Sequence, residues 1–223
     1  MAIDRVTIIG GTGDLGFALG MRWAKAGVHV TIGSREKTKA EAAAERLREQ
    51  VADARVDGLE NPDAAGSCET VVVAVPFSGF VPIYKSISGS LSPESVVIDA
   101  TVPVEASLGG KATHVFGVWE GSAAQLGQAF VPKGTKMCSA FHTLSASAIE
   151  DLDTPVDGDV LVCGNKDGKQ RVRDLVELIP DLRFVDAGPL ENARIIEPIT
   201  ALLIGINHRY GVDRAGIAIT GID

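Results

Sequence analysis

The sequence predicts an α/β fold with a Rossmann-type, doubly wound, mostly parallel sheet and a smaller C-terminal lobe. Short runs of apolar and β-branched residues, typical of buried parallel strands, alternate along the chain with stretches of helical periodicity. A glycine-rich turn also joins the first of these strands to the first helix. We expect a main domain over residues 1–150 and a smaller α/β lobe over residues 151–223.

The elements are justified by the same periodicities, taken in chain order. Apolar runs predict strands at residues 6–9, 28–33, 54–56, 70–75, 95–101, 136–141, 159–163, 183–187 and 215–220. Helical spacing predicts helices at residues 15–23, 37–54, 61–65, 81–91, 122–130, 169–179 and 190–210. Asn61 is expected to cap its helix ahead of Pro62, and Pro198 to kink the last helix. That last helix is apolar over much of its surface, so it is expected to pack on the sheet or on a partner subunit.

The turn after the first strand has the spacing Gly-x-Gly-x-x-Gly, at Gly11, Gly13 and Gly16. In a dinucleotide-binding fold the first glycine allows the tight turn and the second lets the backbone approach a pyrophosphate. The third lets the helix pack closely on the strand. The free N–H groups of the first helical turn then face the anion. The alternative is a glycine-rich turn without a ligand, but the strand–turn–helix context favours nucleotide binding by residues Gly11, Thr12, Gly13, Asp14, Leu15 and Gly16.

The second strand indicates which dinucleotide binds. NAD-binding proteins carry an acidic residue at the end of this strand, whereas here the strand ends in Ser34 and Arg35, with Lys39 four residues later. A hydroxyl, a guanidinium and an ammonium group suit a 2′-phosphate, which a carboxylate would repel. The alternative is that residues 35–39 only begin a solvated helix. The position of the basic residues favours NADP(H).

Composition limits the other functions. The formal net charge of −8 argues against nonspecific binding to nucleic acid. No apolar run reaches the length of a membrane span and the first residues do not form a signal peptide, so we expect a cytoplasmic protein without membrane contact. Cys68, Cys138 and Cys163 lack metal-ligand spacing, so we expect free thiols and no metal.

Residues after two later strands are further candidates for the site. Val75 and Pro76 end the fourth strand and are expected to line the nicotinamide side, whereas Phe77 covers the cofactor or belongs to the core. His142 follows the sixth strand, where the chemistry is expected, although a structural histidine is close to an even alternative. No Tyr-x-x-x-Lys pair is present, because Tyr84 is followed directly by a lysine.

The sequence resembles the NADPH-dependent coenzyme F420 reductases, also called F420H2:NADP oxidoreductases. The resemblance covers nearly the whole chain and rests on six stretches: residues 9–16, 33–35, 74–76, 139–143, 162–164 and 186–190, the last followed by Ala193, Arg194 and Glu197. It differs from the family pattern at Leu144-Ser145-Ala146, where Ile-Pro-Ala is usual, and at Phe77, where Trp is common. Both positions lie near the expected deazaflavin pocket.

The resemblance implies reversible hydride transfer between NADP(H) and the deazaflavin coenzyme F420 in a homodimer. It implies that Thr12, His142 and Leu144 border the two reacting rings, that Ala140 contacts the cofactor and that Ser34, Arg35 and Lys39 hold the 2′-phosphate. Catalysis would then rest on proximity and orientation. Candidates for the anionic tail of F420 are Asn207, His208 and Arg209. Two alternatives are an NADP-dependent reductase of another acceptor (a ferric complex, a flavin or an imine) and a non-catalytic NADP-sensing protein.

Overall fold

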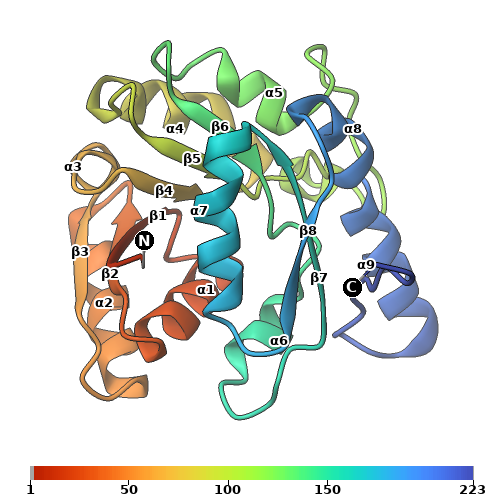
Figure 1. The fold of residues 1–223 in the computed structure, drawn as a ribbon, viewed down its shortest axis with the longest axis horizontal. Helices are drawn as coiled ribbons and strands as arrows, with labels where there is room; N and C mark the ends of the chain where they lie inside the picture. Colours follow the sequence, from red (N-terminus) through yellow and green to blue (C-terminus); the bar gives the residue numbers. More distant parts are fainter. Residues whose placement is uncertain (1–2, 223) are drawn as a thin grey trace.

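The structure is a computed structural model, and it describes residues 3–222. Within that range one sheet of eight strands runs in the order β3-β2-β1-β4-β5-β6-β7-β8 (Figure 1). The strands are β1 (Arg5–Ile9), β2 (His29–Ser34), β3 (Val56–Glu60), β4 (Thr70–Val73), β5 (Val96–Asp99), β6 (Lys136–Ser139), β7 (Gly158–Gly164) and β8 (Leu182–Asp186). The α-helices are α1 (Asp14–Lys25), α2 (Lys37–Gln50), α3 (Asn61–Gly66), α4 (Phe80–Ile87), α5 (Ala123–Gln128), α6 (Ala146–Glu150), α7 (Lys166–Glu177), α8 (Ala193–Ile196) and α9 (Ile199–Tyr210).

The strand order creates a crevice at one edge of the sheet. Strands β1 to β6 are parallel, whereas β7 runs antiparallel to β6 and parallel to β8. The order reverses between β1 and β4, because the chain leaves β1 toward β2 and β3 and then returns to the other side of β1. Such a reversal leaves a crevice at the carboxyl ends of the strands, and this is where open α/β sheets bind ligands.

Helices cover both faces of the sheet, which confirms the doubly wound fold (Figure 1). One core lies beneath α1, α2, α6 and α7, and the other lies beneath α3, α4, α5 and α8. Both faces are buried because side chains of one strand alternate between them, with Val72 in the first core and Val71 and Val73 in the second.

The C-terminal part of the chain packs directly on the first helix. The Trp23 indole N–H in α1 donates to the Leu175 carbonyl in α7 at 3.0 Å. The buried Arg22 side chain donates to the carbonyl oxygens of Ile149 and Thr154, at 2.8 and 2.9 Å. These contacts join α1 to α6 and to the segment that leads into β7.

Three expectations about elements are wrong. The single helix over 190–210 is divided into a 3₁₀ turn (Leu190–Asn192), α8 and α9, with the break at Pro198. Residues 215–220 form no strand: the Asp159 N–H donates to the Ile217 carbonyl at 2.7 Å, but the next N–H along, that of Ile219, donates to the Asp159 carboxylate instead of a backbone carbonyl. Asn61 is the first residue of α3 and makes no capping hydrogen bond, and Glu60 occupies the cap position.

The cysteines are free thiols, as the sequence predicted, although one of them is only partly buried. All three cysteines are free; Cys138 and Cys163 are buried, and Cys68 is half-buried. Among residues 3–222, no helix combines the length and the hydropathy that a membrane span needs.

Candidate active site

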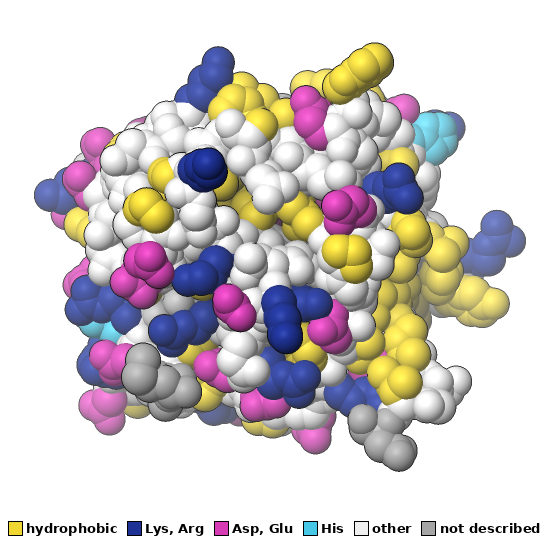
Figure 2. Space-filling model, turned by 45° about the horizontal axis from the view of Figure 1, so that its top comes forward, with side chains coloured by type: hydrophobic (Ala, Val, Ile, Leu, Met, Phe, Trp, Pro, Cys, Tyr) yellow, Lys and Arg dark blue, Asp and Glu magenta, His cyan; other side chains and the backbone are white. Residues whose placement is uncertain are grey.

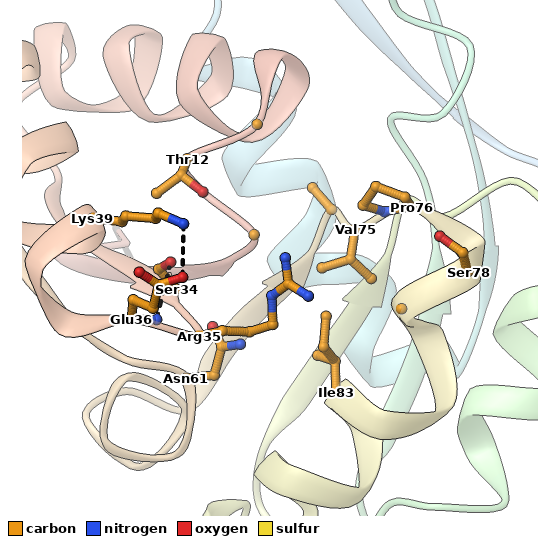
Figure 3. Close-up of a pocket in the computed structure, with 14 residues that line it drawn as sticks. Thr12, Ser34, Arg35, Glu36, Lys39, Asn61, Val75, Pro76, Ser78 and Ile83 are labelled. Carbon is orange, nitrogen blue, oxygen red and sulfur yellow. Dashed lines mark hydrogen bonds and ion pairs between the residues drawn. The ribbon is translucent and has the colours of Figure 1, made fainter. Parts of the chain in front are cut away.

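A cavity of about 380 Å³ opens at the point where the strand order reverses (Figure 3). Its volume lies within the range of about 300–1,000 Å³ that is typical of small-molecule sites. Its walls come from the segments that follow β1, β2, β3 and β4, and from α4. The lining residues are Gly10, Thr12, Gly13, Ser34, Arg35, Glu36, Lys39, Asn61, Ala74, Val75, Pro76, Ser78, Gly79 and Ile83.

The glycine-rich loop has backbone geometry that larger residues would disturb. Gly10 has a φ of +82°, and a Cβ atom there would lie 2.4 Å from the Ala74 carbonyl oxygen. A Cβ atom on Gly16 would lie 2.7 Å from the Gly10 carbonyl oxygen. Helix α1 begins after Gly13 without a side-chain cap. Its first N–H groups are therefore available to an anion.

The end of β2 supplies the positive charge of the cavity. Ser34 is buried, and Arg35 forms no ion pair with any residue that the structure describes. In Figure 3 the Arg35 guanidinium points toward Val75 and Ile83. The Lys39 Nζ atom instead lies 2.7 Å from Glu36 Oε1 in an exposed ion pair. Arg35 and Lys39 give the cavity a basic end in a protein whose net charge is −8.

His142 is held by a strained turn at the end of β6. Phe141, directly before it, has a φ of +69°, which is rare for a bulky side chain. Its ring packs edge-on against Trp23 with 5.6 Å between the ring centroids. Thr200 Oγ1 of α9 donates to the His142 carbonyl oxygen at 2.7 Å. Such strain persists only where surrounding packing enforces it, and it is common at functional sites.

The imidazole of His142 is buried and unpaired. It is 3% exposed, and neither ring nitrogen has a hydrogen-bond partner among the described residues. Burial lowers the pKa of His142 to about 4, with a smaller opposing influence from the Ala140 backbone. The ring is therefore neutral near pH 7, with one nitrogen able to donate and the other able to accept.

This burial makes stability depend on pH. The folded protein binds a proton at His142 less tightly than the unfolded chain does. Protonation of His142 therefore leaves the free energy of unfolding unchanged above about pH 6.5. The free energy of unfolding decreases as the pH falls from there toward 4. We expect His142→Gln to reduce the slope of unfolding free energy against pH in this window by about 1.4 kcal/mol per unit. Chemical denaturation measures the slope; exposed His208→Gln is the control, and an unchanged slope in His142→Gln would contradict the expectation.

Two carboxyl groups are buried next to the strand ends. Asp99 Oδ2 accepts from the Tyr84 hydroxyl at 2.6 Å, and burial raises the pKa of Asp99 to about 7. Glu197 accepts from the N–H groups of Ala123 and Ala124, at 2.8 and 3.0 Å. Burial also raises the pKa of Glu197 to about 8, although these two N–H donors oppose the shift. Glu197 therefore joins the segment after α8 to the start of α5, and positions the C-terminal helices.

The cavity brings together part of the set of residues expected from the sequence. Seven of them line it: Thr12, Gly13, Ser34, Arg35, Lys39, Val75 and Pro76. Phe77 is half-buried and packs on Phe80 and Phe116, with ring centroids 5.7 and 6.4 Å away. Ala140 and His142 are buried outside this cavity, and Leu144 lines a second cavity of about 190 Å³.

Sequence reasoning assigned no site role to several lining residues, chiefly Glu36 and Asn61. In the sequence, Glu36 is one of several charged residues at the start of an expected helix, and nothing there indicates that it lines a cavity. Asn61 directly follows a strand, as Arg35 does, and that position in an alternating β/α pattern is the signal that could have identified it.

The fold, the glycine loop at the switch point and the basic end of β2 define the class of Rossmann-type dinucleotide-binding proteins. A family model described as "NADP oxidoreductase coenzyme F420-dependent" matches residues 5–103. The F420-dependent NADP reductase of Methanothermobacter thermautotrophicus is 43% identical, over 99% of this chain and 96% of the relative. That of Methanocaldococcus jannaschii is 40% identical, over 98% of this chain and 99% of the relative. The chain belongs to the F420-dependent NADP reductase family.

Solved structures agree on the fold. A candidate F420-dependent NADP reductase from Arthrobacter superposes with a TM-score of 0.80 at 23% identity, covering 98% of this chain and 100% of that one. The NADP-bound pyrroline carboxylate reductase of Plasmodium falciparum gives a TM-score of 0.57 at 15% identity, covering 93% of this chain and 65% of that one.

Proposed function

We propose that the protein transfers a hydride reversibly between NADP(H) and coenzyme F420. The observation that carries the NADP(H) half is the basic end of β2, where Ser34, Arg35 and Lys39 line one cavity with the glycine loop. Full-length relatives at 39–43% identity that are named F420-dependent NADP reductases support the F420 half.

The residues of the chain would bind and orient the two coenzymes. Hydride passes directly between the nicotinamide and the deazaflavin when both are bound. The free N–H groups at the start of α1 suit the pyrophosphate. Val75 and Pro76 suit the nicotinamide-ribose side, because they line the cavity beyond the end of β4. We assign no general acid or base, and the rate enhancement comes from proximity and orientation.

The deazaflavin is proposed to lie between the strand ends and the C-terminal lobe of residues 151–223. There Thr12, Leu144 and the neutral His142 would border the reacting rings. The two unpaired ring nitrogens of His142 support this role, because a buried imidazole that donates or accepts a hydrogen bond can fix a ring in one pose. His208 and Arg209, in the last turn of α9, are proposed for the anionic tail. Asn207 is the weaker candidate, since its Oδ1 atom already accepts from the Ala215 N–H at 2.9 Å.

We also propose a cytoplasmic homodimer. Ile195 and Leu202, at α8 and α9, are 61% and 63% exposed. Figure 2 shows a hydrophobic surface on the side of the molecule where these helices lie. A second copy of this face would remove that apolar surface from water.

The test is a spectroscopic assay. Purified protein is mixed with NADPH and oxidised F420, and the visible absorbance of the deazaflavin is followed. We expect it to decay. Persistence of that absorbance while a flavin, ferric complex or imine is reduced would identify a reductase of another acceptor. Tight NADP binding without turnover of any acceptor would identify a sensor.

In the same assay His142→Ala is expected to lower kcat, or raise the KM for F420, by about tenfold, the effect of losing one hydrogen bond that orients a reactant. The KM for NADPH is expected to stay within about twofold. His208→Ala, at a proposed tail contact, should raise the KM for F420 without lowering kcat, so a fall in kcat in His142→Ala marks ring positioning. Unchanged kinetics in His142→Ala would return this residue to a structural role.

A further inference from the structure

Asn61 is a buried polar residue of the cavity to which the proposed function gives no role. It is 3% exposed, it lines the cavity, and its Oδ1 atom has no hydrogen-bond partner within residues 3–222. Buried polar atoms are nearly always paired, so an unpaired acceptor in the wall of a ligand cavity indicates that the ligand supplies the donor.

Asn61 lies at the end of the cavity that holds the positive charge. It directly follows β3, whose last residue, Glu60, is paired in the sheet with Ser34. Figure 3 shows the Asn61 side chain beside Arg35. Gly33 leaves room for the amide, because a Cβ atom at Gly33 would come within 3.0 Å of Asn61 Oδ1. The amide is therefore close to the groups that suit a 2′-phosphate, at the adenosine end of the dinucleotide.

The chemistry of the unpaired atom restricts its partner. Phosphate oxygens are acceptors, so they match Ser34, Arg35 and Lys39 but cannot satisfy Asn61 Oδ1, which needs a donor from the ribose or the base. The adenine base carries its 6-amino group beside N7, which places a donor beside an acceptor on that edge. A primary amide presents the complementary acceptor and donor, and this pairing is a standard way in which asparagine recognises adenine.

We propose that Asn61 is a specificity-determining residue that recognises the amino edge of the adenine base of NADP(H). This inference rests on the proposed binding of NADP(H) and extends it from the 2′-phosphate to the base. Two residues of the cavity would then recognise the same nucleoside independently: Arg35 the 2′-phosphate on its ribose, and Asn61 its adenine base.

The experiment compares two ligands that differ only at the base. Isothermal titration calorimetry measures the Kd of NADP⁺ and of its 6-oxo analogue, in which hypoxanthine replaces adenine, so that the edge formed by position 6 and N7 carries two acceptors. We expect the unmodified protein to prefer NADP⁺ by about fivefold, the effect of one neutral hydrogen bond. Asn61→Ala should bring the ratio of the two Kd values close to one. Ser78→Ala, which changes another polar residue that lines the cavity, should leave the ratio as it is.

Asn61→Asp is a second variant for which the inference predicts a higher ratio of the two Kd values. A folding defect or a general loss of affinity would not raise that ratio. The asparagine amide can rotate and present its NH₂ group to the 6-oxo base, whereas an aspartate only accepts. Asn61→Asp should therefore raise the preference for NADP⁺ to about tenfold or more, the effect of a hydrogen bond to a charged acceptor. Its repulsion of the 2′-phosphate weakens both ligands equally and cancels in the ratio.

Three results would overturn the inference: equal binding of the two ligands by the unmodified protein, an unchanged ratio in Asn61→Ala, or a ratio in Asn61→Asp as low as that in Asn61→Ala. Tight NADP⁺ binding without a base preference overturns this inference alone. Failure of NADP⁺ itself to bind overturns the proposed function as well.

Discussion

Arg35→Ala is expected to raise the KM for NADPH by about tenfold to a hundredfold, and the KM for NADH by no more than about twofold. The range corresponds to the loss of charge-assisted hydrogen bonds to a dianionic phosphate, which NADH lacks. Arg35 should contribute most of the discrimination, because it has no competing carboxylate, whereas Lys39 is paired with Glu36. Steady-state kinetics with both cofactors measure the effect.

The matched control for this variant is Lys37→Ala. It also removes one positive charge near the start of α2, but Lys37 does not line the cavity and its ammonium lies 3.8 Å from Glu41. It should leave the KM for both cofactors nearly unchanged. Equal losses for NADPH and NADH in Arg35→Ala would remove the basis for the NADP(H) assignment.

Gly16→Val is expected to raise the KM for NADPH and NADH together by more than about a hundredfold. The Cβ atom would lie 2.7 Å from the Gly10 carbonyl oxygen and 3.0 Å from Gly11 Cα, so the start of α1 must move away from the loop. That movement displaces the N–H groups proposed to hold the pyrophosphate, which is common to both cofactors.

Gly89→Ala is the control for this second variant, because a Cβ atom at Gly89 meets nothing within 4 Å. Thermal unfolding separates a misplaced loop from a lost fold, since a folded Gly16→Val protein should still show a cooperative transition. Binding of both cofactors with unchanged affinity would contradict the placement of the pyrophosphate at this helix.

The order of strands and helices could be predicted from the sequence because each local pattern used has a single structural explanation. Strands buried on both faces are apolar throughout, and the turn after β1 carries its glycines in a fixed spacing. Ser34 and the basic residue Arg35 were identifiable for the same reason, since the end of the second strand has a constant place beside the ribose.

The remaining features depend on contacts between distant segments. The left-handed backbone of Phe141 results from packing against Trp23 of α1, and nothing in the sequence near Phe141 indicates it. The expected strand over 215–220 was wrong because its pairing with β7 stops after one backbone hydrogen bond, and the Asp159 carboxylate accepts from the Ile219 N–H in place of a backbone carbonyl. Asn61 resembled a helix cap because caps and ligand contacts use the same residue types at the same strand-to-helix junctions.

The ion pair between Glu36 and Lys39 places a carboxylate among the basic residues that line the cavity. A free phosphate or sulfate ion in the cavity can pair directly with Arg35. To pair with Lys39 it must first displace the Glu36 carboxylate. A dinucleotide anchored at its pyrophosphate presents its 2′-phosphate at a high effective concentration and can displace the Glu36 carboxylate. An exposed ion pair of this kind contributes no more than about 1 kcal/mol, so it lowers the affinity of this end of the cavity for a free inorganic anion by about fivefold at most.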